Sequence, residues 1–441
     1  MGRGKNSRVV QRNLRERGTG DRVTGFLCRM FAGNGFRDHY MNIVEVNFAD
    51  LVGRIFNGYD LHMALREKGV NACQIVMDKR SESDSVKCLS KDLVLHHQIH
   101  EFEKVNSISN LLYPYGEEMI HCREFSRADI VHYHILHNGM VSLLDYPRLM
   151  NAKKSVWTIH DPWIITGNCV HPLACDKWKR GCGGCNRINE IYFELSTDNT
   201  DFMWEQKRRI MAQINPHIVV ASKFMKRYLQ ESPVTEHFSD IHVIPFGVKT
   251  EKYARANCEK RERQLRVKDH KLVIGFRADQ AEIKGSRYIY EALRKAGLGA
   301  KIQLICVGNG KVPEDIKRMY HTTELGWVDD EQRVMDFYQA CDIFLMPSLA
   351  ESFGMMAVEA LASECAVICF KGTVLEEVTN APECGIAVEY LSSDALASEI
   401  TRLTEHPEEA IRRGRKGFGY VEAHYGFDAY VDRHIELYEE I

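Results

Sequence analysis

The chain has 441 residues, of which 44% are hydrophobic, 27% charged and 10% aromatic, with a formal net charge of −3. These values are typical of a folded globular protein that is large enough for two or more domains. The near-neutral charge excludes binding to nucleic acid or to anionic membranes through bulk charge alone. No run approaches the roughly 18 apolar residues that a membrane-spanning helix needs.

Residues 1–40 differ from the rest of the chain. They are basic, rich in glycine and without apolar periodicity, which predicts a disordered N-terminal arm. Such an arm is either a dispensable tail or a basic contact for a membrane or partner surface. Fourteen cysteines without an apolar signal core favour a reducing compartment. We therefore expect a cytoplasmic protein, peripheral at the inner face of the membrane if the arm binds there.

From Met41 to Val248, short β-branched runs alternate with segments that are apolar at helical spacing. The first helical segment, residues 59–70, contains the stop signal Gly69. The runs end in polar, glycine or proline residues, which predicts βαβ organisation with a parallel sheet. The predicted strands are 41–47, 73–77, 128–134, 155–161, 217–222 and 241–248.

A charged stretch at 249–271 is a predicted linker, after which the alternation restarts. The predicted strands of this second half are 271–277, 302–310, 322–327, 341–348 and 366–370. The sequence therefore predicts an α/β fold with two Rossmann-like, doubly wound domains that face a central cleft. Ligands of such folds bind at the carboxyl ends of the strands.

Several histidines follow strands of the first half. His160 and Asp161 end one predicted strand, so they are candidates for a general base, with a purely structural histidine as the alternative. Alternation along D-I-V-H-Y-H places His132 and His134 on one face of another strand, the arrangement of a metal pair. No carboxylate or thiol partner is evident, so we favour structural or acceptor-side roles for His132, His134 and His137.

Four cysteines cluster in a loop at 166–187. Cys169, Cys175, Cys182 and Cys185 lie among glycine, proline and charged residues, and the last two form a C-G-G-C knuckle. This composition favours tetrahedral structural zinc, with disulfides or unliganded thiols as alternatives. His171 is a candidate replacement for one thiolate. Four protein ligands would leave no open position, so we expect no catalytic metal here.

Two cations mark the start of the second half. Arg277 ends a predicted strand and Lys284 precedes a helix, a pair that suits a diphosphate without a metal ion. Solvated surface cations are the alternative. The V-G-N-G-K turn contains Gly308, which either lets the backbone approach a ligand or simply reverses the chain.

The stretch P-S-L-A-E-S-F-G-M-M-A-V-E-A-L-A, residues 347–362, leads from a strand into a helix and contains two glutamates eight positions apart. Its free backbone N–H groups after Ser352, Phe353 and Gly354 are suited to an anion. A rise of at most ~12 Å separates Glu351 from Glu359, about the span of a sugar, a diphosphate and a ribose. We interpret Glu351 as an acceptor for sugar hydroxyls and Glu359 as an acceptor for ribose hydroxyls; their spacing alone is also compatible with chance.

Residues 327–362 resemble the signature of family-4 glycosyltransferases with the GT-B architecture and an E-x7-E motif, densely over 324–390 and more loosely from Met41 onwards. The resemblance implies that Glu351 contacts the donor sugar, that Glu359 binds the ribose and that Arg277 and Lys284 hold the diphosphate. It further implies donor contacts at Gly53, in the loop D-L-V-G-R-I-F-N-G, and at His160. The Cys-rich loop resembles one in a subset with H-D-x-W-x-x-T-G. S-E-C-A-V, residues 363–367, departs from the family's Cys-Gly-x-Pro-Val turn.

The resemblance also implies domain boundaries and an activity. The acceptor domain is 41–248, the nucleotide-sugar domain 249–418, and residues 419–441 form a helix that returns to the first domain. We expect a retaining, metal-independent hexosyltransferase that uses a UDP- or GDP-linked sugar and a glycan or lipid-linked acceptor hydroxyl, as in polysaccharide biosynthesis. The alternatives are an inverting transferase or epimerase with His160 or Asp161 as base, or a non-catalytic nucleotide-sugar-binding subunit. No nucleic-acid partner is expected.

Overall fold

The structure, a computed structural model, describes residues 41–89, 92–188, 194–254, 265–266 and 272–441. The predicted N-terminal arm and most of the predicted linker, residues 255–264 and 267–271, lie outside the described residues. Residues 41–441 form one compact unit that contains two parallel sheets.

Seven parallel strands form the first sheet, in the order β3-β2-β1-β4-β5-β6-β7. Its strands are β1 (Asn42–Val46), β2 (Asn71–Val76), β3 (Val86–Cys88), β4 (Ile130–Tyr133), β5 (Lys154–Thr158), β6 (His217–Val220) and β7 (Ile241–Val243). The order changes direction between β1 and β4, so the loops after these two strands meet at a topological switch point, where α/β sheets bind ligands.

Six parallel strands form the second sheet, in the order β10-β9-β8-β11-β12-β13. Its strands are β8 (Leu272–Arg277), β9 (Ile302–Val307), β10 (His321–Glu324), β11 (Ile343–Met346), β12 (Ala366–Phe370) and β13 (Ile386–Val388). Here the switch point lies between β8 and β11. Every residue of β11 is buried, as expected of a parallel strand covered on both faces.

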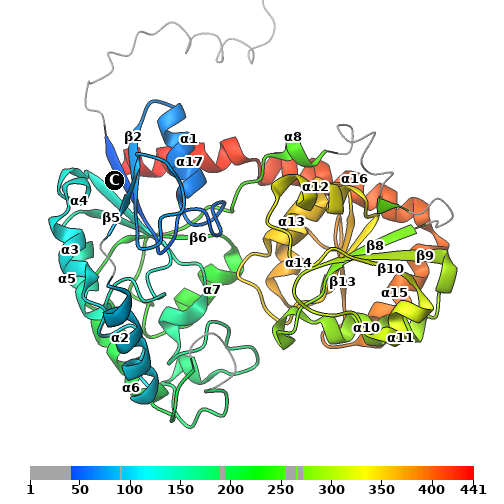
Figure 1. The fold of residues 1–441 in the computed structure, drawn as a ribbon, viewed down its shortest axis with the longest axis horizontal. Helices are drawn as coiled ribbons and strands as arrows, with labels where there is room; N and C mark the ends of the chain where they lie inside the picture. The colour runs from blue at the N-terminus through cyan, green and yellow to red at the C-terminus, as the bar shows by residue number, and fades with distance from the viewer. Residues whose placement is uncertain (1–40, 90–91, 189–193, 255–264, 267–271) are drawn as a thin grey trace, which may run out of the picture. The chain divides into compact units, whose positions relative to one another are not determined.

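Helices connect the strands of both sheets (Figure 1). Those of the first half are α1 (Tyr59–Glu67), α2 (Leu93–Val105), α3 (Tyr115–His121), α4 (Arg123–Arg127), α5 (Tyr146–Met150), α6 (Thr200–Met211) and α7 (Lys223–Glu231). Those that follow are α8 (Thr250–Tyr253), α10 (Ser286–Ala296), α11 (Glu314–Met319), α12 (Glu331–Gln339), α13 (Met355–Ala362), α14 (Val374–Val378), α15 (Ser393–Glu405), α16 (Pro407–His424) and α17 (Phe427–Glu440).

The final helix, α17, contacts the first sheet although the chain reaches it from the second. Lys68, just after α1, pairs with Asp432 of α17 at 2.8 Å, and the hydroxyl of Tyr438 reaches Glu45 of β1 at 3.0 Å. A backbone bridge joins Val248 to Gly426 where the chain passes between the halves. One buried hydrophobic cluster includes residues of both halves, so the two sheets share packing as well as covalent connections.

Two polar contacts also join the halves at the start of α7. Glu377 of α14 accepts hydrogen bonds from the backbone N–H groups of Lys223 (2.8 Å) and Phe224 (3.0 Å). The hydroxyl of Ser222 donates to the carbonyl of Ser352 at 2.9 Å. A carboxylate on the first amides of a helix is favourable, because these groups have no partner within the helix.

The predicted fold class is confirmed: the protein is α/β, with two Rossmann-like sheets. The three-residue strands β3 and β13 were not predicted, because runs this short leave little periodic signal. The sheets lie on either side of residue 248, and the predicted boundaries at 248/249 and 418/419 remain predictions.

Candidate active site

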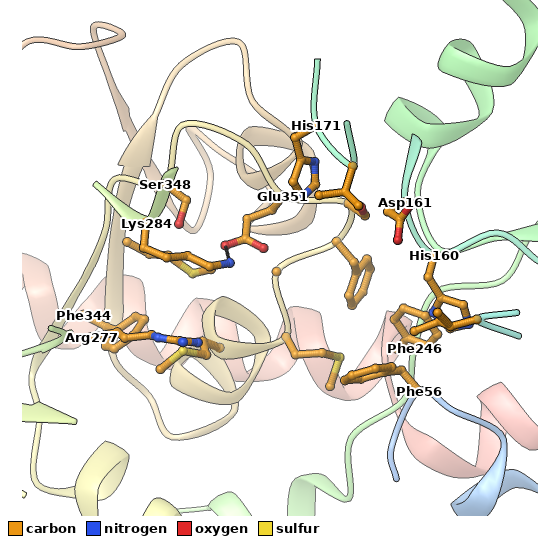
Figure 2. A pocket seen from close by; sticks show the side chains of 18 of the residues that line it. Phe56, His160, Asp161, His171, Phe246, Arg277, Lys284, Phe344, Ser348 and Glu351 are labelled. Carbon is orange, nitrogen blue, oxygen red and sulfur yellow. Dashed lines mark hydrogen bonds and ion pairs between the residues drawn. The ribbon is translucent and has the colours of Figure 1, made fainter. Parts of the chain in front are cut away.

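A cavity of about 610 Å³ is lined by residues that follow strands of both sheets (Figure 2). Loops at the two switch points contribute most of its polar groups. From the first half these polar and aromatic groups are Phe56, His137, Asn138, His160, Asp161, His171 and Phe246. From the second half they are Arg277, Lys284, Phe344, Ser348, Glu351, Ser352 and Phe353. The second half therefore contributes two cations and the carboxylate of Glu351 to the cavity, and the first half contributes three histidines and the carboxylate of Asp161.

Arg277 is the last residue of β8 and lines the cavity. Its Nη2 pairs with Asp279 Oδ2 at 2.6 Å, and its guanidinium lies 5.7 Å from the centroid of the Trp327 ring. The Nε atom is buried and has no hydrogen-bond partner among the described residues. A guanidinium with an unused buried donor is suited to an anionic ligand.

Lys284 lies in a 3-10 turn, η5 (Glu282–Lys284), just before α10. Its Nζ donates a hydrogen bond to Glu351 Oε1 at 2.8 Å, and both side chains are largely buried. Burial is the largest influence on the pKa of Glu351 and raises it. The Lys284 ammonium, helped by His171 and Ser348, outweighs burial and holds that pKa below its usual value. Glu351 is therefore an ionised acceptor at neutral pH.

The start of α13 borders the same space. Ser352, Phe353 and Gly354 line the cavity, and no described side chain caps the helix at Gly354. The first N–H groups of a helix have no intrahelical partner, and the helix dipole adds partial positive charge there. Together with the two cations, this N-terminus forms a region that suits a diphosphate.

Asp161 is held firmly in the opposite wall. Its Oδ1 accepts a hydrogen bond from the backbone N–H of Trp163 at 2.8 Å, and its Oδ2 accepts one from His137 Nε2 at 3.2 Å. Burial raises the pKa of Asp161, but His137 and the backbone N–H together lower it to about 2. A carboxylate of such low pKa is a weak base at neutral pH, so Asp161 is better suited to hold His137.

His160 lies between two aromatic rings. Its imidazole stacks on Phe246 with centroids 5.5 Å apart and lies 5.9 Å from Phe56. Its Nε2 lies 3.1 Å from His134 Nδ1. Burial, followed by the neighbouring His134, lowers the pKa of His160 well below its usual value. The ring is consequently neutral at physiological pH and can accept as well as donate a hydrogen bond.

Besides His132 and the four cysteines, four predicted site residues are not part of the cavity lining. His134 is buried behind His160, and Glu359 is buried in α13 with its Oε2 accepting a hydrogen bond from Tyr338 at 2.8 Å. Burial raises the pKa of Glu359 to about 7, although hydrogen bonds from Tyr338 and Tyr253 oppose the rise. The ribose role of Glu359 therefore remains a prediction. A ribose that binds this carboxyl has to share it with the hydroxyl groups of Tyr338 and Tyr253.

The two remaining residues are glycines whose identity is explained by packing. A Cβ on Gly53 would lie 2.5 Å from the Phe56 ring, and one on Gly308 would lie 2.3 Å from the carbonyl oxygen of Ala278. Both have positive φ, 70° and 111°. Their predicted donor contacts are not tested by this geometry. Gly53 acts on the site indirectly, because it lets Phe56 pack close to the loop.

The four cysteines of the 166–187 loop are free thiols. Among the described residues, no three of these sulfur atoms lie within 4.8 Å of one another. Burial raises the pKa of the Cys182 thiol to about 12, and its sulfur accepts a hydrogen bond from the N–H of Gly167. Zinc binding stays a prediction for metal analysis of the purified protein, and we assign no chemistry to it.

Within the described part of the chain, two other groups have potential ligand atoms this close together. His217, Asp240 and His242 lie at the edge of the first sheet, and Glu45, His132 and His134 are fully buried. Glu45 is the carboxylate partner that the sequence did not reveal for the two histidines of β4. It was missed because β1 and β4 are neighbours only in the folded sheet.

Sequence reasoning also missed part of the cavity wall. Phe56, Phe246 and Ser348 were not singled out, and His171 was considered only as a zinc ligand. Phe246 and Ser348 each follow a strand by two or three residues, which is the signal that would have found them. His171 lies close enough to Glu351 to lower the pKa of that carboxyl.

Two protein-family models match this chain. "Glycosyltransferase Family 4" matches residues 59–252, and "Glycosyl transferases group 1" matches residues 257–418, so the two models together span most of the sequence. The chain belongs to the family-4 glycosyltransferases. Its E-x7-E spacing and its Cys-rich loop are features of this sequence whose roles within the family remain predictions.

Some curated relatives of this glycosyltransferase family member match only over limited lengths. The protein WcaC of Escherichia coli is 29% identical over 22% of this chain, and an MMP alpha-(1->4)-mannosyltransferase of Mycolicibacterium hassiacum is 24% identical over 54%. These matches span only 28% and 56% of the two relatives' own lengths. A D-inositol 3-phosphate glycosyltransferase of Corynebacterium glutamicum is 28% identical over 66% of this chain and 68% of the relative.

Solved structures show the same fold. A sucrose-phosphate synthase of Thermosynechococcus elongatus has a TM-score of 0.63 and 17% identity, covering 91% of this chain and 98% of that protein. The Anabaena protein HepE, solved in complex with UDP and glucose, has a TM-score of 0.61 and 13% identity, covering 91% and 100%. At these identities the likeness establishes the fold, and this family member has the GT-B architecture. Among its described helices, none is long and apolar enough to cross a membrane.

Proposed function

We propose that this protein transfers a sugar from a nucleotide-diphosphate sugar to an acceptor hydroxyl, with retention of anomeric configuration and without a catalytic metal ion. One observation carries the proposal. Arg277, Lys284 and the uncapped start of α13 surround one side of a cavity in which Glu351 is ionised and His160 is neutral. The cations supply the charge that a metal ion would otherwise provide to a diphosphate.

In the proposed reaction, the bond between the anomeric carbon and the diphosphate oxygen breaks, and its electron pair stays on the diphosphate. Arg277, Lys284 and the first amides of α13 stabilise the charge that develops there. The acceptor oxygen forms the new bond on the same face of the sugar. Its proton passes to the departing diphosphate oxygen, so that no protein base is needed. Glu351 accepts hydrogen bonds from hydroxyls of the transferred sugar.

The donor is proposed to be a UDP- or GDP-linked hexose, and the acceptor a glycan or a lipid-linked precursor. A UDP complex of HepE, a protein of the same fold, supports the nucleotide-sugar class. Screening UDP- and GDP-sugars for thermal stabilisation tests the donor, because a ligand of the folded state raises Tm by mass action. Stabilisation by a nucleoside diphosphate but not by the nucleoside is the expected result, since most contacts proposed here are with phosphate.

An inverting transferase or an epimerase is the second candidate, and the neutral state of His160 is the observation that favours it. A neutral imidazole in the cavity wall could remove the acceptor proton directly. Proton NMR of the first-formed product decides between the two, because the anomeric coupling shows whether configuration is retained. Comparing turnover with and without added Mg²⁺ or Mn²⁺ tests the metal-independent mechanism.

A non-catalytic nucleotide-sugar-binding subunit is distinguished by variants of the site. If Arg277→Ala and Glu351→Ala leave turnover of a reconstituted system unchanged while donor still binds, catalysis resides elsewhere. A cytoplasmic location is proposed from the free thiols of the Cys-rich loop. Peripheral membrane contact is supported by exposed apolar side chains of α2, among them Leu93 and Val94, at 70% and 67% exposure. Flotation with vesicles of neutral and anionic lipid tests that contact.

A further inference from the structure

Behind His160, buried polar side chains form a continuous chain of hydrogen bonds. Its centre is Glu45 of β1, which is fully buried. Glu45 Oε2 lies 2.7 Å from His134 Nε2, and His134 Nδ1 lies 3.1 Å from His160 Nε2. Glu45 Oε1 accepts a hydrogen bond from the hydroxyl of Tyr438 at 3.0 Å. The cavity wall is thus connected through β4 and β1 to the C-terminal helix α17.

The order of donors and acceptors follows from the carboxylate. The pKa of Glu45 is lowered, because His132 and His134 outweigh the effect of burial, so the ionised group can only accept hydrogen bonds. His134 must then donate through Nε2–H. Burial lowers the pKa of His134 to about 4, so its ring is neutral and its Nδ1 can only accept. The partner of that acceptor, His160 Nε2, must therefore hold a proton.

A second arm holds the carboxylate in place. His132 Nδ1 lies 2.7 Å from the Tyr438 hydroxyl and 3.1 Å from Glu45 Oε2, while its Nε2 lies 2.7 Å from the Thr158 hydroxyl. The directions of two of these contacts follow from the carboxylate. Tyr438 donates to Glu45, so its oxygen accepts from His132 Nδ1–H, whichever way the contact between His132 Nε2 and the Thr158 hydroxyl runs. Both carboxylate oxygens are then occupied, which prevents the carboxylate from turning away from His134.

We propose that Glu45 and Tyr438 are positioning residues that fix His160 as its Nε2–H tautomer, leaving the lone pair on Nδ1 to accept a hydrogen bond from a sugar hydroxyl in the cavity. The assignment of a sugar hydroxyl rests on the proposed function, whereas the tautomer does not. Glu45 and His134 thus determine that His160 Nδ1, and not Nε2, accepts a hydrogen bond from a ligand. Hydrogen-bond partners orient the ligating histidines of metal sites in the same way.

Hydrogen bonds account for the cluster better than a bound metal ion. Each nitrogen–oxygen and nitrogen–nitrogen distance in the chain, between 2.7 and 3.1 Å, is a normal hydrogen-bond length. Both nitrogens of His132 and both of His134 already have partners within the network. A metal-bound form of Glu45, His132 and His134 is nevertheless an outcome that the experiment can detect.

The test begins with long-range ¹H–¹⁵N NMR of the full chain labelled at histidine, with the His160 signal assigned by its loss in His160→Gln. A proton on Nε2 of His160 in the wild-type protein is expected. A proton on Nδ1, or histidine shifts that change on metal removal by a chelator, would overturn the proposal. This readout does not depend on any transferase activity, so failure of the proposed function leaves it intact.

Variants then connect the tautomer to the reaction. Glu45→Gln is expected to give mixed tautomers at His160 and to lower kcat ~10–100-fold, the range found for partners that orient histidine ligands, with donor Kd within about twofold of wild type. Tyr438→Phe should give a smaller effect of the same kind, and it remains informative if Glu45→Gln fails to fold. Wild-type tautomer and kcat in both variants would contradict the assignment.

Matched controls separate positioning from loss of stability. Glu103→Gln changes another buried carboxylate, which accepts backbone hydrogen bonds from residues 110–112. Tyr320→Phe removes a buried hydroxyl that donates to Leu293 in the second half. Both should lower Tm while His160 keeps its tautomer. If these controls reduced kcat as much as Glu45→Gln and Tyr438→Phe do, the effect would be structural and the proposal would fail.

Discussion

Lys284 Nζ and Glu351 Oε1 lie 2.8 Å apart in the cavity, so without a ligand the two residues proposed to contact different parts of the donor are bonded to each other. Their side chains are 20% and 14% exposed. An incoming diphosphate has to share or displace this contact. We therefore expect donor binding to weaken the contact between Lys284 and Glu351, because a diphosphate competes with the carboxylate for the ammonium group.

Removing Lys284 should cost stability as well as activity. In Lys284→Ala, Glu351 is left largely buried without its cation, and we expect a loss of about 1–3 kcal/mol in the free energy of unfolding at pH 7. The pKa of Glu351 is lowered in the folded state, so its contribution is present above the unfolded pKa and is lost as pH falls through the folded one. The difference from wild type, measured by urea unfolding, should shrink towards acidic pH.

The double variant Lys284→Ala/Glu351→Gln serves as the control for this experiment. A neutral amide removes the unpaired charge, so stability should return towards wild type while turnover stays low. If the double variant is as unstable as the single one, the loss comes from packing of the lysine stem and not from the ion pair.

Arg277 should contribute to the affinity for the phosphate groups of a nucleotide but not to the affinity for its nucleoside. Arg277→Gln removes a guanidinium whose buried Nε has no described partner, and we expect the Kd for UDP or GDP to rise ~10–100-fold, in line with ~1.5–3 kcal/mol for a charge-assisted hydrogen bond. Isothermal titration calorimetry measures the change. Affinity for the bare nucleoside should be unaffected. Arg294→Gln, which breaks a surface pair with Asp315, should leave nucleotide binding as it is.

Glu359 should make the free energy of unfolding depend on pH in the opposite direction from Glu351, because its pKa is raised and not lowered. Burial raises its pKa from the ordinary value of 4.5 to about 7, so between these pH values the folded state holds a proton that the unfolded chain releases. Stability should decline as pH rises from about 4.5 to about 7 and stay lower above that, by at most roughly 3 kcal/mol. Glu359→Gln keeps an acceptor for Tyr338 and should therefore stabilise the protein at pH 8 but hardly at pH 4.5. Equal Tm changes at both values would show that the carboxyl is ionised throughout.

Glu377 should couple the two halves. Its carboxylate accepts hydrogen bonds from the first amides of α7 in the other half, so Glu377→Ala should lower the free energy of unfolding by ~0.5–2 kcal/mol, as for a lost helix cap. We also expect a larger radius of gyration in X-ray solution scattering, since the contact spans the halves. Glu376→Ala is the matched control, because Glu376 accepts a hydrogen bond from Gly372 in the same half. An unchanged scattering curve in Glu377→Ala would rule out a coupling role.

Much of the fold and part of the site could be predicted from local pattern. Strands buried on both faces produce continuous apolar runs such as that of β11, and the residues that follow them meet at one edge of a parallel sheet. Arg277, Lys284 and Glu351 were found in this way, and the cavity brings all three together. Their placement could be anticipated because each residue's position depends on its own strand and turn, while their roles remain predictions.

The partners of Glu359 and His134 could not be predicted in the same way. Glu359 is bonded to Tyr338 of a different helix, and His134 to Glu45 of a neighbouring strand, 89 residues away. Such pairings depend on which strands become neighbours and on how helices pack. A single sequence contains no periodic signal for either. The partners that determine whether a buried group is charged are therefore the hardest residues to predict from the sequence.

The hydrogen bond between Tyr438 and Glu45 has a consequence for folding during synthesis of the chain. The two residues are 393 positions apart, so at about 5–20 residues per second roughly 20–80 seconds of translation separate their synthesis. During that interval Glu45 and His132, which both contact the Tyr438 hydroxyl in the folded chain, lack that partner. The hydrogen bonding of this buried cluster is therefore completed only after the last helix has been synthesised.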